Sequence, residues 1–119
     1  MVLSADAGRC LEGIIRTVVE QREGAVIYHC SAGKDRAGVI SALLLRLLGA
    51  EDSAIYADYL YTNTALSHEL EEAQSAALAL SGDERAANYV LGFFAACPCW
   101  LAAALDTLDK RFYSIEGYI

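Results

Sequence analysis

The hydrophobic residues recur at helical spacing along most of the chain. From residue 4 to about residue 20, charged residues are interspersed with apolar ones that lie three and four positions apart: Leu11, Ile14, Ile15, Val18 and Val19. This pattern predicts an amphipathic helix with one apolar face. A second apolar helix is predicted from about Arg36 to Leu48, where Gly49 is a suitable stop.

The second half of the chain predicts consecutive helices. Capping residues at 52–53, at 63–64 (Asn63 or Thr64) and in the SGDE turn at 81–84 begin helices that extend to about residues 62, 80 and 96. Pro98 opens a last helix to about residue 111, because proline is well suited to the first position of a helix.

One short segment predicts a different element. Residues 25–29, AVIYH, are mostly apolar and partly β-branched, and they predict a buried strand. A parallel strand needs neighbours, so either short strands lie elsewhere or the chain is part of a larger α/β domain. We therefore expect an α/β fold that is predominantly helical, with an incomplete or very small parallel sheet.

Composition and charge limit the partners of this chain. Its 119 residues suit one domain with a single core, and 55% hydrophobic residues with one proline fit a folded, mostly helical protein. The net charge of −7 makes nucleic acid an unfavourable general partner. An anion would therefore have to be bound by a local site.

Residues 86–105 carry no charge over twenty positions, which is long enough to span a bilayer. Asn88, Gly92 and Pro98 interrupt this run, so we predict two buried helices with a break at 97–99 and no transmembrane segment. The N-terminus lacks a basic-then-apolar signal sequence, which favours a cytoplasmic protein, with a secreted effector as the alternative.

The four cysteines, at positions 10, 30, 97 and 99, show no disulfide framework. The C-P-C pair lacks the C-x2-C spacing of a metal site, so packing is the expected role of Cys97 and Cys99, and no metal or cofactor is predicted. Cys30 differs from the others because it follows the predicted strand and precedes a helix. In a reducing compartment such a cysteine is more often reactive or buried than crosslinked.

The loop from Cys30 to Arg36 has the spacing C-x5-R and can form an anion site. If residues 31–35 wrap, their backbone N–H groups point inward and the following helix adds its positive end. Gly33 permits the left-handed backbone that such a turn needs, and the Arg36 guanidinium can bind two phosphate oxygens. The same donors would lower the pKa of Cys30, making it a thiolate nucleophile toward a bound phosphoryl group.

The sequence HCSAGKDRAG, from His29 to Gly38, resembles the signature loop of cysteine-dependent protein tyrosine phosphatases. It is most similar to the bacterial tyrosine and lipid phosphatases whose loop reads HCxAGKDRTG. Residues 57–63 and 101–119 also resemble the helices that follow the loop in that group. The resemblance implies one phosphatase-like domain over residues 1–119, truncated at its N-terminus relative to the family.

The resemblance also implies a role for each loop residue. Cys30 would be the nucleophile that forms a phosphocysteine, and Arg36 would bind phosphate and stabilise the transition state. Asp35 would help to protonate the leaving group, and Lys34 would suit highly charged substrates such as phosphoinositides. Together with Arg36, the residues that bind phosphate would be Ser31, Ala32, Gly33, Lys34 and Asp35.

Other roles for these side chains stay open. Lys34 could be a solvated surface residue, and Asp35 could pin the loop by pairing with a nearby cation. His29 is expected to be a hydrogen-bonded structural residue behind the cysteine rather than a base. Ala37 stands where the family usually has Thr or Ser, whose hydroxyl helps the thiolate to leave, so slow turnover is expected.

The activity implied by the resemblance is hydrolysis of phosphomonoesters: phosphotyrosine, phosphoserine or phosphothreonine in the dual-specificity case, or a phosphoinositide. The alternative is a pseudophosphatase module that binds phosphate with little or no catalysis. The expected partner is therefore a phosphorylated protein or a phosphoinositide, and unpaired strand edges could join copies into a homo-oligomer.

Overall fold

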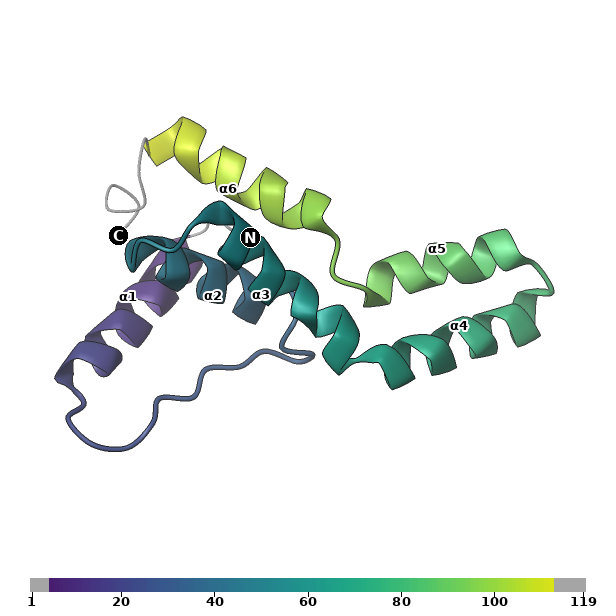
Figure 1. Cartoon of the computed structure of the whole chain (residues 1–119), viewed down its shortest axis with the longest axis horizontal. Helices are drawn as coiled ribbons and strands as arrows, with labels where there is room; N and C mark the ends of the chain where they lie inside the picture. The colour runs from purple at the N-terminus through teal and green to yellow at the C-terminus, as the bar shows by residue number, and fades with distance from the viewer. Residues whose placement is uncertain (1–4, 113–119) are drawn as a thin grey trace.

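The computed structural model describes residues 5–112, which form six α-helices (Figure 1). They are α1 (Ala5–Glu20), α2 (Arg36–Leu47), α3 (Asp52–Ala65), α4 (Ser67–Ser81), α5 (Glu84–Phe94) and α6 (Pro98–Phe112). The predominantly helical architecture is therefore confirmed. Residue 4 and the last part of the 101–119 segment lie outside the described residues.

Several helix ends agree with the residues predicted to set them. α2 ends before Gly49, whose φ of +80° is a left-handed conformation that glycine tolerates best. The Asp83 side chain accepts a hydrogen bond from the Arg85 backbone N–H at 2.8 Å and so caps α5. Pro98 is the first residue of α6, where a missing N–H leaves no helical bond unmade.

The predicted helix cap at Asn63 or Thr64 is wrong. α3 continues through both residues to Ala65, and α4 begins at Ser67. The Asn63 amide nitrogen instead donates to the Ala96 carbonyl at 2.9 Å, and its oxygen accepts from the Ala96 N–H at 2.6 Å. Both polar atoms of the Asn63 amide therefore bond to the backbone of Ala96 and do not cap a helix nearby in the sequence.

The hydrophobic core is formed mainly by α2, α3 and α6 (Figure 1). Leu11 of α1, Ile55 of α3 and Leu101 of α6 are the largest fully buried side chains of the core. Arg46 of α2 and Asp109 of α6 form a two-pronged ion pair, with both N···O distances at 2.9 Å. Apolar packing and this ion pair together fix α2 against the rest of the core.

α4 and α5 form a helical hairpin that extends away from the core (Figure 1). None of the α4 side chains is buried. Across the hairpin, the Gln74 amide donates to the Asn88 side-chain oxygen at 2.9 Å. The hairpin is therefore held mainly by contacts between its own two helices, and the Asn63 bonds to Ala96 tie its base to α3.

The predicted strand at residues 25–29 is not formed. Residues 21–35 belong to no helix or strand and connect α1 to α2 as an irregular segment (Figure 1). A parallel strand needs a hydrogen-bonded neighbour, and between residues 5 and 112 the chain supplies none. The very small parallel sheet expected from the sequence is therefore not confirmed.

Cys97 and Cys99 form a disulfide, which corrects the prediction that both are packing thiols. Pro98 turns the chain between them as α6 begins, and their Cα atoms lie 5.3 Å apart, within the usual range for a disulfide. In the sequence, the spacing of this cysteine pair does not by itself indicate a disulfide. Local backbone geometry, rather than spacing, brings the two sulfurs together.

Taken singly, none of the helices between residues 5 and 112 is long and apolar enough to cross a membrane. α5 and α6 taken together reach that length and composition, but they bend by 43° at the break between them. The break between α5 and α6 lies next to the helix break that the sequence predicted at 97–99.

Counting thiols tests the Cys97–Cys99 disulfide. In protein purified without reductant and then denatured, two thiols, Cys10 and Cys30, should react with an aromatic disulfide reagent, and four should react after reduction with a dithiol. The control is Cys97→Ser, which leaves Cys99 unpaired and should give three reactive thiols without reduction. Four reactive thiols in the unreduced wild-type protein would contradict the bond.

Candidate active site

The loop that precedes α2 leaves several backbone N–H groups without helical partners. The helical hydrogen bonds of α2 begin with the Gly38 N–H, which donates to the Lys34 carbonyl at 3.1 Å. N–H groups before that position have no carbonyl to bind, as at the start of any helix. Gly33, with a φ of +67°, turns the backbone within the loop. These N–H groups are therefore available to a group at the centre of the loop.

The Cys30 sulfur accepts hydrogen bonds from these N–H groups. The Ala37 N–H lowers the pKa of the Cys30 thiol most, burial opposes this effect, and the N–H groups of Gly33, Ala32 and Arg36 lower the pKa further. The net result is a pKa below the ordinary value of a thiol, so the thiolate is favoured. A nest of amides that stabilises a thiolate can also bind the oxygens of an anion.

Arg36 is the first residue of α2, and its side chain is exposed. Within residues 5–112 its guanidinium has no hydrogen-bond or ion-pair partner. Ser31, Ala32 and Gly33 are exposed as well, and Cys30 is half-buried. The loop is therefore open to solvent, and the guanidinium is available to a ligand bound there.

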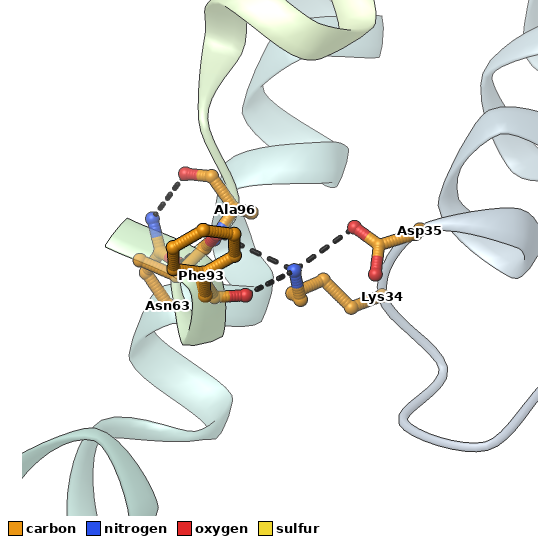
Figure 2. Close-up of polar contacts among 6 residues, drawn as sticks. Lys34, Asp35, Asn63, Phe93 and Ala96 are labelled. Carbon is orange, nitrogen blue, oxygen red and sulfur yellow. Dashed lines mark hydrogen bonds and ion pairs between the residues drawn. The ribbon is translucent and has the colours of Figure 1, made fainter. Parts of the chain in front are cut away.

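The Lys34 side chain is buried, with 4% of its surface exposed, and points toward the end of α5 (Figure 2). Its ammonium donates to the Asp35 carboxylate at 2.9 Å and to the Phe93 carbonyl at 3.1 Å. The Trp100 ring lies 4.9 Å from the same nitrogen. The alternative of a solvated surface lysine is therefore wrong, and contact between this ammonium and a substrate stays a prediction.

Asp35 pairs with Lys34, as expected if it pins the loop (Figure 2). Its carboxylate is about half exposed. The nearby Tyr59 has a raised pKa, chiefly because it is buried and secondly because of the negative charge on Asp35. The role of Asp35 as a proton donor stays a prediction, since here the carboxylate accepts a hydrogen bond from a buried ammonium.

Two contacts hold the segment that leads into the loop. The Tyr28 hydroxyl lies 2.7 Å from the Ser41 hydroxyl on α2. His29 is exposed, and its Nδ1 lies 3.2 Å from the Cys30 carbonyl oxygen, which fits the structural role expected of it. Both contacts act close to Cys30 and so position its backbone.

Gly38 lets α2 approach the core closely beside the loop. A Cβ added at Gly38 would lie 3.0 Å from two carbons of the Tyr59 ring, which is closer than ordinary van der Waals contact. Tyr59 is itself a buried member of the core. The first turn of α2, which carries the site, therefore rests directly on α3.

Phe93 and Trp100 are neighbours of the loop that sequence reasoning does not single out. Lys34 and Phe93 are 59 positions apart, so no local pattern connects them. The one available signal was the uncharged run at 86–105, which predicted a break near 97–99 but not what that break would face.

Comparison with known proteins gives the family. Residues 1–119 match the tyrosine phosphatase family over the whole chain, and the chain belongs to that family. The resemblance inferred from HCSAGKDRAG is thereby confirmed.

Curated relatives are also named as phosphatases. The chain is 32% identical over 124 residues to the triple specificity protein phosphatase PtpB of Mycobacterium tuberculosis, covering 95% of this chain and 43% of the relative. It is 44% identical over 46 residues to a tyrosine-protein phosphatase of Nostoc commune, covering 39% of this chain and 16% of the relative. It is also 29% identical over 107 residues to a Cupriavidus necator protein that is provisionally named a tyrosine-protein phosphatase. This match covers 90% of this chain and 37% of the relative. The chain thus spans less than half the length of these relatives.

The lowered pKa of Cys30 predicts a pH profile for its reactivity. Labelling by iodoacetamide should increase through the lowered pKa and level off before the pH at which an ordinary thiol ionises. At pH 6, Cys30 should react about tenfold faster than the exposed Cys10, which serves as the internal control. Peptide mass spectrometry separates the two sites. Equal rates with parallel pH profiles would show that the amides do not stabilise the Cys30 thiolate.

Proposed function

We propose that this protein is a phosphoric monoester hydrolase in which Cys30 is the nucleophile and a phosphocysteine is the intermediate. The observation that carries the proposal is the lowered pKa of Cys30, caused above all by the Ala37 N–H and further by the N–H groups of the loop. Membership of the tyrosine phosphatase family supports it independently.

Substrate binding would use the same backbone donors. A phosphate monoester carries up to two negative charges on its free oxygens, and the loop N–H groups with the positive end of α2 suit such a dianion. The exposed Arg36 guanidinium can grip two of those oxygens in a fork, which a lysine cannot do. Since the chain carries a net charge of −7, the attraction has to come from this local site.

The reaction then proceeds in two displacements. The Cys30 thiolate attacks phosphorus, the bond from phosphorus to the ester oxygen breaks, and its electron pair leaves with that oxygen, which takes a proton from Asp35 or from water. Water next attacks the phosphocysteine, the phosphorus–sulfur bond breaks, and its electron pair returns to sulfur as thiolate while phosphate departs. Arg36 and the loop N–H groups stabilise the charge on the transferring group in both steps.

Ala37 makes the second displacement slow in this proposal. Its backbone N–H is the main donor to the Cys30 sulfur, but its methyl side chain offers no hydroxyl to bind that sulfur as it leaves phosphorus. The residue is buried, with 8% of its surface exposed, so water does not readily take the place of the hydroxyl. The phosphocysteine should therefore accumulate during turnover.

The open loop favours a range of phosphate esters. Because Ser31, Ala32 and Gly33 are exposed, the group attached to the phosphate does not have to fit a deep pocket. We extend the proposal to phosphotyrosine, to phosphoserine or phosphothreonine and to phosphoinositides. This is the range implied by the loop resemblance, and the triple specificity name of the Mycobacterium tuberculosis relative supports it.

A phosphate-binding pseudophosphatase is the second candidate. Two observations favour it: the Asp35 carboxylate is paired with Lys34 rather than free to act as an acid, and Ala37 lacks the hydroxyl. Such a module would bind phosphate or vanadate through the same loop N–H groups, with little or no turnover.

Hydrolysis of p-nitrophenyl phosphate near pH 6 tests the proposal. Cys30→Ser and Arg36→Ala should each lower kcat/KM by about a thousandfold, because they remove the nucleophile and the clamp on the transition state. Ala37→Ser, which adds the hydroxyl with little extra volume, should raise kcat about threefold or more. Cys10→Ser is the matched control and should behave as wild type.

Each alternative outcome has a distinct meaning. Turnover that survives Cys30→Ser would rule out the phosphocysteine mechanism. No turnover in the wild type, together with a melting temperature that rises with phosphate or vanadate, would instead identify the pseudophosphatase module.

A further inference from the structure

The Lys34 side chain connects the loop to a part of the molecule remote in sequence. We use the name α5–α6 junction for residues 93–97. The Lys34 ammonium donates to the Phe93 carbonyl in the junction at 3.1 Å (Figure 2) and lies 3.5 Å from the Ala95 carbonyl. The centroid of the Trp100 ring lies 4.9 Å from the same nitrogen. Apart from its bond to Asp35, these contacts all lie on α5, the junction and α6.

The junction is well suited to hold a positive charge. Carbonyls at the end of a helix have no helical donors and carry the negative end of the helix dipole. The Phe93 carbonyl lies in the last turn of α5, which ends at Phe94, and Ala95 is the residue that caps the helix. The face of the Trp100 indole adds a further attraction for a cation. The lysine therefore occupies a site of complementary charge.

The junction is also held from its other side. Asn63 of α3 donates a hydrogen bond from its amide nitrogen to the Ala96 carbonyl (Figure 2), and its side-chain oxygen accepts one from the Ala96 N–H. Ala96 is itself 4% exposed and belongs to the core. The lysine thus bonds to a fixed part of the structure, and its other end is continuous with the backbone of the loop.

Burial decides between two roles for this side chain. An ammonium is costly to bury unless its protons are bonded, and here the Asp35 carboxylate and junction carbonyls accept them. Turning the ammonium toward a substrate would leave the Phe93 carbonyl without this donor and would uncover the ring of Trp100. The arrangement therefore favours a lysine that stays where it is during binding.

We propose that Lys34 is a positioning residue: its ammonium fastens the loop to the α5–α6 junction and so holds the N–H groups of Ala32 and Gly33 on the Cys30 sulfur, rather than contacting the substrate. These two residues directly precede Lys34, so the lysine fixes the backbone from which they donate. The inference deepens the proposed function and rests on it for any effect on turnover, but its effect on Cys30 can be measured without turnover.

Trp100 provides the variant that separates the two roles. Removing Lys34 takes away a positive charge near Cys30, which would by itself disfavour the thiolate. Trp100→Leu changes no charge and removes only the aromatic face against which the ammonium packs. If Lys34 acts by fastening the loop, loss of the ring should also weaken the stabilisation of the Cys30 thiolate. If it acts only by its charge or as a substrate ligand, loss of the ring should have no effect on Cys30.

The experiment is the rate of iodoacetamide labelling of Cys30 against pH, in otherwise wild-type full-length protein. Lys34→Met should slow labelling at pH 6 about threefold or more, and Trp100→Leu about twofold in the same direction. Lys34→Arg keeps a donor for the junction carbonyls and should restore most of the rate. Tyr61→Leu removes an exposed aromatic of α3 and is the matched control, expected to equal wild type.

The double variant sharpens the test. Because the ring of Trp100 acts through the lysine, Lys34→Met with Trp100→Leu should label Cys30 no more slowly than Lys34→Met alone. Circular dichroism confirms that each variant is folded. If Lys34→Met does not fold, the labelling rate of Trp100→Leu can still be compared with those of Lys34→Arg and Tyr61→Leu. That comparison decides whether Lys34 acts by fastening the loop.

Two results would overturn the inference. One is a Trp100→Leu protein that labels like wild type. The other is a Lys34→Met protein that labels like wild type but has a raised KM for a phosphoinositide, which would make the lysine a substrate ligand. A chain without turnover that still shows the expected labelling pattern would keep this inference while rejecting the proposed function.

Discussion

The hydrogen bonds from unpaired backbone N–H groups to the Cys30 sulfur are the interaction on which the proposed chemistry depends. Any helix start leaves such groups without carbonyl partners, and here the loop turns at Gly33 and adds its own amides to those of Ala37 and Arg36. The donors belong to the backbone, so they keep their place without a basic surface. An acidic chain can in this way stabilise a thiolate and bind a phosphoryl group at one point.

The rest of the structure keeps that helix start in place. Tyr59 packs against Gly38 in the first turn of α2, and Arg46 near its end is bound to Asp109 of α6. The loop itself is fastened by the bonds that Lys34 makes to the end of α5. Packing from α3, an ion pair to α6 and a buried lysine therefore act on one short segment, which links the fold to the reactivity of Cys30.

Local signals predicted the helices and the loop, because apolar spacing, the Asp83 cap and Pro98 act within a few residues of where they lie. Features that depend on distant partners could not be predicted. The segment at 25–29 has strand-forming residues but no neighbour to pair with within the described range. Asn63 looks like a helix cap, yet it bonds a backbone 33 positions away. For Lys34 the sequence allowed a solvated lysine or a substrate contact, and nothing local indicated that it is buried against α5.

Direct detection of phosphate on Cys30 is the measurement closest to the central claim. The protein is mixed with p-nitrophenyl phosphate, quenched in acid during the first turnovers and digested for mass spectrometry. We expect one phosphoryl group on the peptide that contains Cys30, present at high occupancy because Ala37 slows its hydrolysis, and absent from Cys30→Ser. Release of p-nitrophenol with no phosphorylated Cys30 at any time, or with the phosphoryl group on another residue, would contradict it.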